Sequence, residues 1–107
     1  MVVQWSVCVR GIREACSGPY FPDWEFETLI GFRREFVEGI AAEEEVSKRK
    51  WGSDEVSAIL NVANNIEGYP HGHASRFTER VGMSPGEFAA LVRSLASQLS
   101  VDERRDP

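Results

Sequence analysis

Residues 74–99 read ASRFTERVGMSPGEFAALVRSLASQL, and they carry the strongest structural signals in the chain. Residues 84–87, SPGE, form a capping box with proline at the first helical position, which predicts a helix beginning at Pro85. The apolar residues that follow recur three and four positions apart, which predicts a helix with one buried face. They are Phe88, Leu91, Val92, Leu95 and Leu99. Gly82 lies just before the capping box and is typical of a residue that ends the preceding helix.

The same apolar spacing and the same kinds of turn residue divide the rest of the chain into helices. We predict six helices joined by short connections, at residues 3–15, 24–30, 33–48, 54–67, 74–81 and 85–99. Asp23 and Ser53 are the predicted N-caps of the second and fourth helices. The predicted fold class is therefore all-α, a compact bundle of about six short helices. It forms one domain over residues 1–107, with an N-terminal helix within residues 1–18 and a flexible tail at residues 101–107.

The apolar faces of these helices define the predicted core. In the first helix they are Trp5, Cys8, Val9, Ile12 and Cys16. Cys8 and Cys16 lie roughly 12 Å apart along a helix and so cannot form a disulfide there. Two free buried thiols are typical of a protein in a reducing cytoplasm. The residues predicted to face inward in the second to fifth helices are Phe26, Leu29, Ile30, Phe36, Val37, Ile40, Val56, Ile59, Leu60, Val62, Ala63, Ile66, Phe77 and Val81.

Composition and charge restrict the function classes. Of the 107 residues, 42% are hydrophobic and 27% are charged, which is typical of a globular domain. The net charge of −5 argues against a dedicated nucleic-acid binder, because neutralising phosphates requires a basic surface. We expect no membrane span, because the apolar runs are only a few residues long. We also expect no signal peptide, because Arg10 and Arg13 interrupt the N-terminal apolar stretch.

Residues 26–40 and 77–92 resemble each other in outline. Each begins with a phenylalanine, has a glycine five residues later, and continues with a Glu-Phe pair in the next predicted helix. This is the outline of a helix-turn-helix, so a transcriptional regulator that binds DNA through Arg76, Arg80 and Arg93 is one alternative function. The start of the last helix carries no basic residue, however, and binding to nucleic acid is not favoured.

The densest polar cluster lies at residues 61–73, NVANNIEGYPHGH, where the fourth predicted helix ends. Asn61, Asn64 and Asn65 lie on the side away from the apolar stripe. Their amides suit hydrogen bonding to a partner, and the alternative interpretation is a solvent-facing side of the helix.

Glu67 falls within the apolar arc of the same helix, with His71 four residues further on. A partly buried carboxylate beside a histidine is the arrangement of a general acid/base pair, so a small enzyme is a second alternative function. Glu67, His71 and His73 are too few for a tetrahedral metal site, and we predict no metal or other cofactor. The simpler interpretation is a rigid turn in which a histidine nitrogen bonds one of the last carbonyls of the helix.

An aromatic segment connects the first two predicted helices. It contains Tyr20, Phe21, Trp24 and Phe26, and Trp51 lies further along the chain. Two interpretations stay open. In one, the rings fill an end of the core. In the other, they form an exposed hot spot for a protein partner, with a rim of acidic residues at Asp23, Glu25 and Glu27.

Three segments resemble a pattern shared by small, largely uncharacterised all-helical bacterial proteins. They are FPDWEFETLIGF at residues 21–32, NNIEGYPHGH at 64–73 and VGMSPGEF at 81–88. The matching pattern is FP-x-WEF and TL-x-G, then NN…GYPHG and VG-x-S-x-x-E, over about residues 21–95. The resemblance implies an all-helical fold but no established activity and no catalytic residue. Small acidic proteins of this kind are often immunity or antitoxin-type binders.

Together these observations predict a cytoplasmic, non-enzymatic module that binds another protein, and the negative charge favours a basic partner. No catalytic residue is assigned, and homodimerisation through an apolar helix face stays open. The predicted partner-binding residues are Trp24, Glu25, Glu27, Asn61, Asn64, Asn65, Tyr69, His71 and His73.

Overall fold

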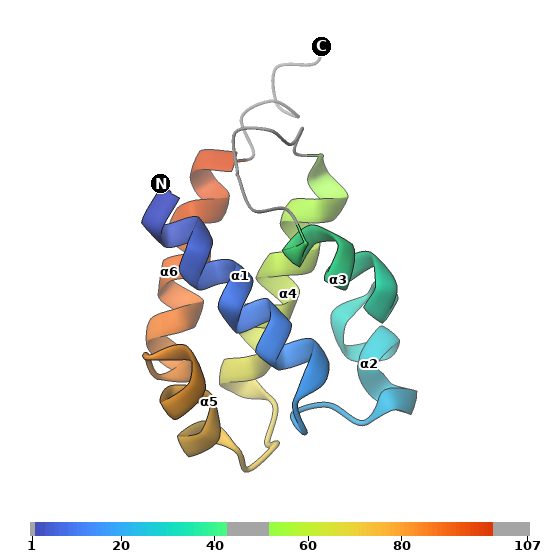
Figure 1. Cartoon of the computed structure of the whole chain (residues 1–107). Helices are drawn as coiled ribbons and strands as arrows, with labels where there is room; N and C mark the ends of the chain where they lie inside the picture. The colour runs from blue at the N-terminus through green and yellow to red at the C-terminus, as the bar shows by residue number, and fades with distance from the viewer. Residues whose placement is uncertain (1, 43–51, 100–107) are drawn as a thin grey trace.

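The computed structural model of the chain describes residues 2–42 and 52–99, and these residues form a bundle of helices (Figure 1). The helices are α1 (Val2–Ser17), α2 (Asp23–Ile30), α3 (Arg34–Ala41), α4 (Ser53–Gly68), α5 (Ala74–Val81) and α6 (Pro85–Leu99). Within the described ranges there is no strand, so the predicted all-α class is confirmed. None of these helices combines the length and the hydropathy that crossing a bilayer requires.

The long helices α1, α4 and α6 form the centre of the bundle. Helix α4 packs most extensively on α6, and α1 crosses in front of both in the view of Figure 1. The short helices lie at the periphery: α3 and α5 pack on opposite sides of α1, and α2 packs on α4. The two helix pairs that share a sequence outline, α2–α3 and α5–α6, therefore lie on opposite sides of the molecule (Figure 1).

The buried core draws on all the described helices, and its closest packing of large rings lies where α1, α5 and α6 meet. The rings of Phe77 and Phe88 contact each other edge to face, with centroids 5.1 Å apart, and both side chains are fully buried. Gly11 gives α1 the close approach that this packing needs, because a Cβ atom there would collide with the Phe88 ring. The apolar face predicted for α1 is confirmed by the burial of Trp5, Cys8, Val9, Ile12 and Cys16.

Both cysteines are free and buried, as predicted. Burial raises the pKa of each thiol to about 12, because the charged thiolate would lose its hydration. Nearby Glu38 adds to the effect at Cys16. The thiols are therefore protonated and poorly nucleophilic at neutral pH.

The capping box predicted at residues 84–87 is confirmed by two hydrogen bonds. The backbone N–H of Ser84 donates to Glu87 Oε1 at 2.9 Å, and the backbone N–H of Glu87 donates to Ser84 Oγ at 3.1 Å. The bond from the Ser84 backbone N–H lowers the pKa of Glu87, because it favours the ionised carboxylate, and the Ser84 side chain adds to this effect. Gly31 and Gly82 end α2 and α5 in the left-handed conformation, with φ of 86° and 93°.

Two predicted N-caps are wrong by one residue. Helix α2 begins at Asp23 itself, after Pro22, and the Asp23 carboxylate accepts a bond from Arg34 Nη2 at 2.8 Å instead of capping the helix. Helix α4 begins at Ser53, and its cap is Gly52, whose N–H donates to Glu55 Oε1 at 3.0 Å. Only α4 thus has an acidic side chain, Glu55, bonded back to its cap, whereas no side chain caps α2.

The predicted inward position of Phe36 is also wrong. Its side chain is 36% exposed and stacks on Phe32, with ring centroids 5.2 Å apart, while Val37, Ile40 and Ala41 bury the inner face of α3 against α1. Helix α3 ends at Ala41, with Ala42 as its C-cap, short of the predicted end at Lys48. Residues 43–48, Trp51 and the tail lie outside the described residues.

We expect Gly11→Ala to lower the free energy of unfolding by about 1–3 kcal/mol, because the added methyl group must displace the Phe88 ring in a close-packed core. Gly39→Ala is the matched control, because Gly39 also lies in a helix but has open space around it. That substitution should raise stability by about 0.5–1 kcal/mol through helix propensity. Urea unfolding of both variants checks the pair, and equal shifts would contradict the packing described here.

Candidate functional site

The outer face of α2 carries the most exposed large hydrophobic side chain of the described residues. Trp24 is 79% exposed, whereas Phe26 and Ile30 on the inner face of the same helix are buried. Exposing an indole to water is costly, since full burial of an aromatic side chain is worth roughly 2–3 kcal/mol. The hot-spot interpretation of the aromatic segment therefore fits Trp24. The core-filling interpretation fits Tyr20, Phe21 and Phe26, which are all buried.

Acidic side chains flank Trp24 on the same helix. Glu27 is exposed and forms no ion pair with any residue that the structure describes. Glu25 accepts a hydrogen bond from the Tyr69 hydroxyl at 2.8 Å, although the two residues are 44 positions apart. This bond raises the pKa of Tyr69, because ionising the phenol would break it and place two negative charges together. We call Trp24, Glu25, Glu27 and Tyr69 the Trp24 face.

Two of the predicted asparagines are used within the molecule, where they hold the end of α2. The amide of Asn61 donates to the backbone carbonyl of Ile30 at 2.8 Å, and that of Asn65 donates to the carbonyl of Leu29 at 3.1 Å. The last carbonyls of any helix lack intrahelical donors, and the α4 amides supply them here. These side chains therefore support the Trp24 face from behind and do not form the open polar row that the sequence pattern suggests.

Asn64 is exposed, and its Oδ1 accepts a bond from Arg93 Nη2 at 3.0 Å. The same guanidinium nitrogen donates to Glu67 Oε1 at 2.9 Å. Glu67 was expected within the apolar arc, but its side chain is 44% exposed and points to the ion pair on the surface of α6. Its position at the end of α4 lets the carboxylate turn out to water.

Both nitrogens of the His71 ring form hydrogen bonds within the molecule. Its Nε2 bonds the backbone carbonyl of Ile66 at 2.8 Å, and its Nδ1 accepts the backbone N–H of His73 at 2.9 Å. Because a carbonyl only accepts, these bonds assign the proton to Nε2 of a neutral imidazole. The predicted role of a histidine nitrogen at the end of the helix is thus confirmed, whereas no hydrogen bond joins His71 to Glu67 in the described residues.

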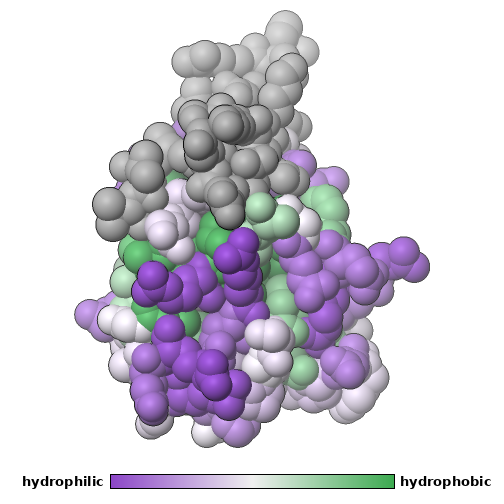
Figure 2. All heavy atoms as spheres, viewed as in Figure 1, coloured by the Kyte–Doolittle hydropathy of each residue, from purple (hydrophilic) through white to green (hydrophobic). Residues whose placement is uncertain are grey.

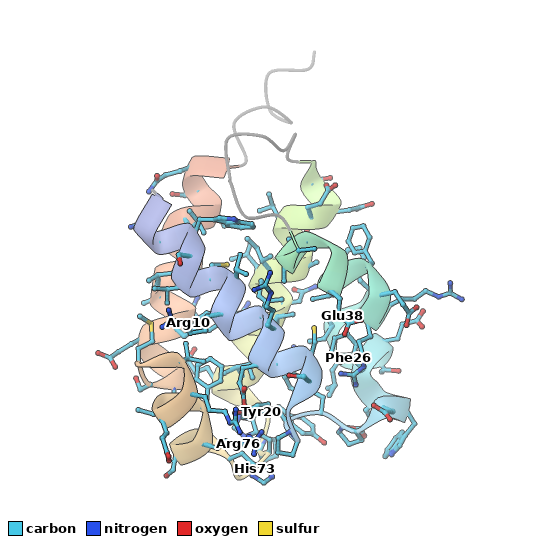
Figure 3. All side chains as sticks on the ribbon, viewed as in Figure 1. Arg10, Tyr20, Phe26, Glu38, His73 and Arg76 are labelled. Carbon is cyan, nitrogen blue, oxygen red and sulfur yellow. The ribbon has the colours of Figure 1, made fainter. Side chains whose placement is uncertain are left out.

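Both histidine rings also pack on Tyr20, with ring centroids 5.0 Å from His71 and 6.1 Å from His73. Figure 3 shows Tyr20, His73 and Arg76 together at one end of the bundle. This packing fixes the loop between α4 and α5 and with it the position of Tyr69. In the described part of the chain, no group of three or more His, Cys, Asp or Glu side chains is placed to hold a metal ion.

Sequence reasoning missed the one buried carboxylate of the described residues, Glu14, which is only 9% exposed. Its Oε2 accepts the Tyr20 hydroxyl at 2.8 Å and Arg76 Nε at 3.1 Å, and it lies 3.7 Å from Arg80 Nε. Burial, followed by the bond to Glu14, raises the pKa of Tyr20 to about 12. The only signal in the sequence was that Glu14 falls beside the apolar stripe of α1.

The arginines of the helix-turn-helix alternative all form internal ion pairs. Arg76 and Arg80 of α5 face Glu14, and Arg93, the only basic residue of α6, pairs with Glu67. The inner face of α6 is buried against α4 and α1. The helix that would enter a DNA groove therefore offers no free basic side chain in its described part.

No protein-family model, no curated protein and no solved structure matches the chain. The resemblance to small bacterial helical proteins stays a prediction from the sequence.

The hydrogen bond between Tyr20 and Glu14 predicts a pH-dependent stability. Because the pKa of Tyr20 is raised from 10 to about 12 in the folded state, the stabilisation is complete below pH 10 and is lost as the pH rises through 12. We expect the free energy of unfolding of the wild type to fall more steeply over this range than that of Tyr20→Phe. Guanidinium unfolding at a series of pH values measures the difference, and parallel curves would contradict it.

Proposed function

We propose that this protein is a non-enzymatic module that binds another protein through the Trp24 face. The observation that carries the proposal is the 79% exposure of Trp24 on a helix whose other apolar residues are buried or partly buried. Tryptophan is the residue type most enriched among binding hot spots, since it supplies a large contact area at a small cost in conformational entropy. A cytoplasmic location, which suits the two free thiols, belongs to the same proposal.

The shape of the surface around Trp24 supports a protein partner. Two hollows border the helix, and Asp23 lines both of them. One, of about 520 Å³, is lined by Phe26, Glu27 and the arginines at the start of α3, and the other, of about 480 Å³, by the loop residues next to Tyr69. An exposed indole on a helix that is bordered by two hollows suits a partner that inserts its own side chains into them.

The charge around the Trp24 face supports a basic partner. Residues 23–38 contain five carboxylates and two arginines, and the whole chain has a net charge of −5. Arg34 is occupied, because it bonds Asp23 and the backbone carbonyl of Cys16 and lies over the Phe26 ring. Attraction to a positive partner would speed the encounter and weaken with salt, as expected for an immunity or antitoxin-type protein that covers a basic enzyme such as a nuclease.

We expect Trp24→Ala to weaken binding to the partner about 30-fold or more, which corresponds to the loss of about 2 kcal/mol for a central hot spot. The wild type and the variant are used as bait in an extract of the source cells, and the captured proteins are identified by mass spectrometry. Titration of the captured partner then gives the affinity. Capture of the same proteins in equal amounts by both baits would overturn the proposal.

A matched pair of charge reversals tests whether the carboxylates of the Trp24 face attract the partner. Glu27→Lys changes the charge on the Trp24 face, whereas Glu79→Lys makes the same change at an exposed position of α5. We expect the first to slow association several-fold at low ionic strength and the second to leave it unchanged, as measured by stopped-flow fluorescence. Equal effects of the two substitutions would show that the association rate depends on the net charge of the chain and not on the charge of the Trp24 face.

A further inference from the structure

A second surface of the molecule has the opposite charge. A groove of about 710 Å³ runs along α1 toward α5, and it is lined by Ser6, Val9, Arg10, Arg13, Glu14, Ser17 and Arg80. Figure 2 shows strongly hydrophilic side chains gathered over α5 and the middle of α1. Three of the seven lining residues are arginines and one is acidic, in a chain whose net charge is −5.

The α1 side of the groove is a row of polar side chains on one helical face. Ser6, Arg10, Arg13 and Ser17 follow one another at intervals of four, three and four residues, which places them in line over roughly 16 Å. Arg10 and Arg13 are exposed, and neither forms an ion pair or a side-chain hydrogen bond with any described residue. In Figure 3, Arg10 lies beside the middle of α1, above Arg76 and Tyr20.

The α5 side of the groove is held in place by the buried Glu14. Glu14 Oε2 accepts hydrogen bonds from Tyr20 and Arg76, so its negative charge is balanced without Arg10 or Arg13. Arg80 Nε lies 3.7 Å from the same oxygen, which is longer than a hydrogen bond, so the donors of Arg80 are oriented by Glu14 without being consumed. Glu14 thus positions the arginines of α5 beside those of α1.

We infer that this groove binds a small molecule through a diphosphate group. The planar guanidinium of arginine matches two phosphate oxygens at once, and the three guanidinium groups of the groove outnumber its single carboxylate, Glu14, which leaves a net positive charge for a diphosphate. The volume falls within the range of small-molecule sites, roughly 300–1,000 Å³.

A small ligand is favoured over a polynucleotide for two reasons. The groove contains no aromatic side chain on which bases could stack, and the chain as a whole has a net charge of −5, which opposes binding of an extended polyanion.

Calorimetric titration of the full chain with inorganic pyrophosphate at low ionic strength tests the inference. We expect Arg10→Glu and Arg13→Glu each to weaken pyrophosphate binding at least tenfold. Arg33→Glu, which makes the same charge change at an exposed position outside the groove, should leave the affinity within about twofold. All three positions are exposed, so we expect the variants to fold, and circular dichroism of each variant checks this.

Parallel titrations with ADP identify the source of the diphosphate. Equal affinities for pyrophosphate and ADP would support recognition of the diphosphate alone, and tighter binding of ADP would support a nucleotide. Absence of binding by either probe would overturn the inference. It would also be overturned by an equal loss in Arg33→Glu, or by groove-dependent binding of duplex DNA without binding of pyrophosphate. Trp24→Ala should bind pyrophosphate normally, which keeps this result separate from that of the proposed function.

Discussion

The structure depends most on the buried carboxylate of Glu14. Burying a charge is costly unless donors surround it, and here the donors come from the connector after α1 and from α5. Tyr20, held by Glu14, in turn packs against His71, His73 and Phe77, so one carboxylate ties together three segments that lie far apart in the sequence. Replacing Tyr20 or Arg76 would remove a donor from this buried carboxylate, which is costlier than the loss of a hydrogen bond between exposed groups.

This arrangement separates the charges of the molecule. Arginines gather along α1 and α5, and carboxylates gather around α2 and the start of α3, on the other side of α1 in Figure 1. A chain with a net charge of −5 therefore has one locally positive groove and one acidic face with an exposed indole. The two surfaces suit ligands of opposite charge, and each is built on a different short peripheral helix packed against the long central ones.

Features that depend on neighbours within a few residues could be predicted from the sequence. The SPGE capping box, the two left-handed glycines and the apolar stripes of α1, α4 and α6 are of this kind. Periodicity could not reveal features set by distant segments. Glu14 meets Arg76 across 62 positions, Asn61 meets Ile30 across 31, and Phe36 lies outside because α3 turns Val37 and Ile40 toward α1. For the candidate site, Trp24 was identified from the sequence, but the supporting role of the asparagines required the fold.

The attachment of α2 has a consequence for how the protein moves. This helix of eight residues contacts the bundle mainly through α4, where Asn61 and Asn65 bond its last carbonyls. Segments with few tertiary contacts open at a lower free energy than the global transition, so the amide hydrogens of α2 should exchange with solvent deuterium before those of α4 and α6. Trp24 thus belongs to a unit that can open while the remaining helices stay folded, and a bound partner would protect those amides.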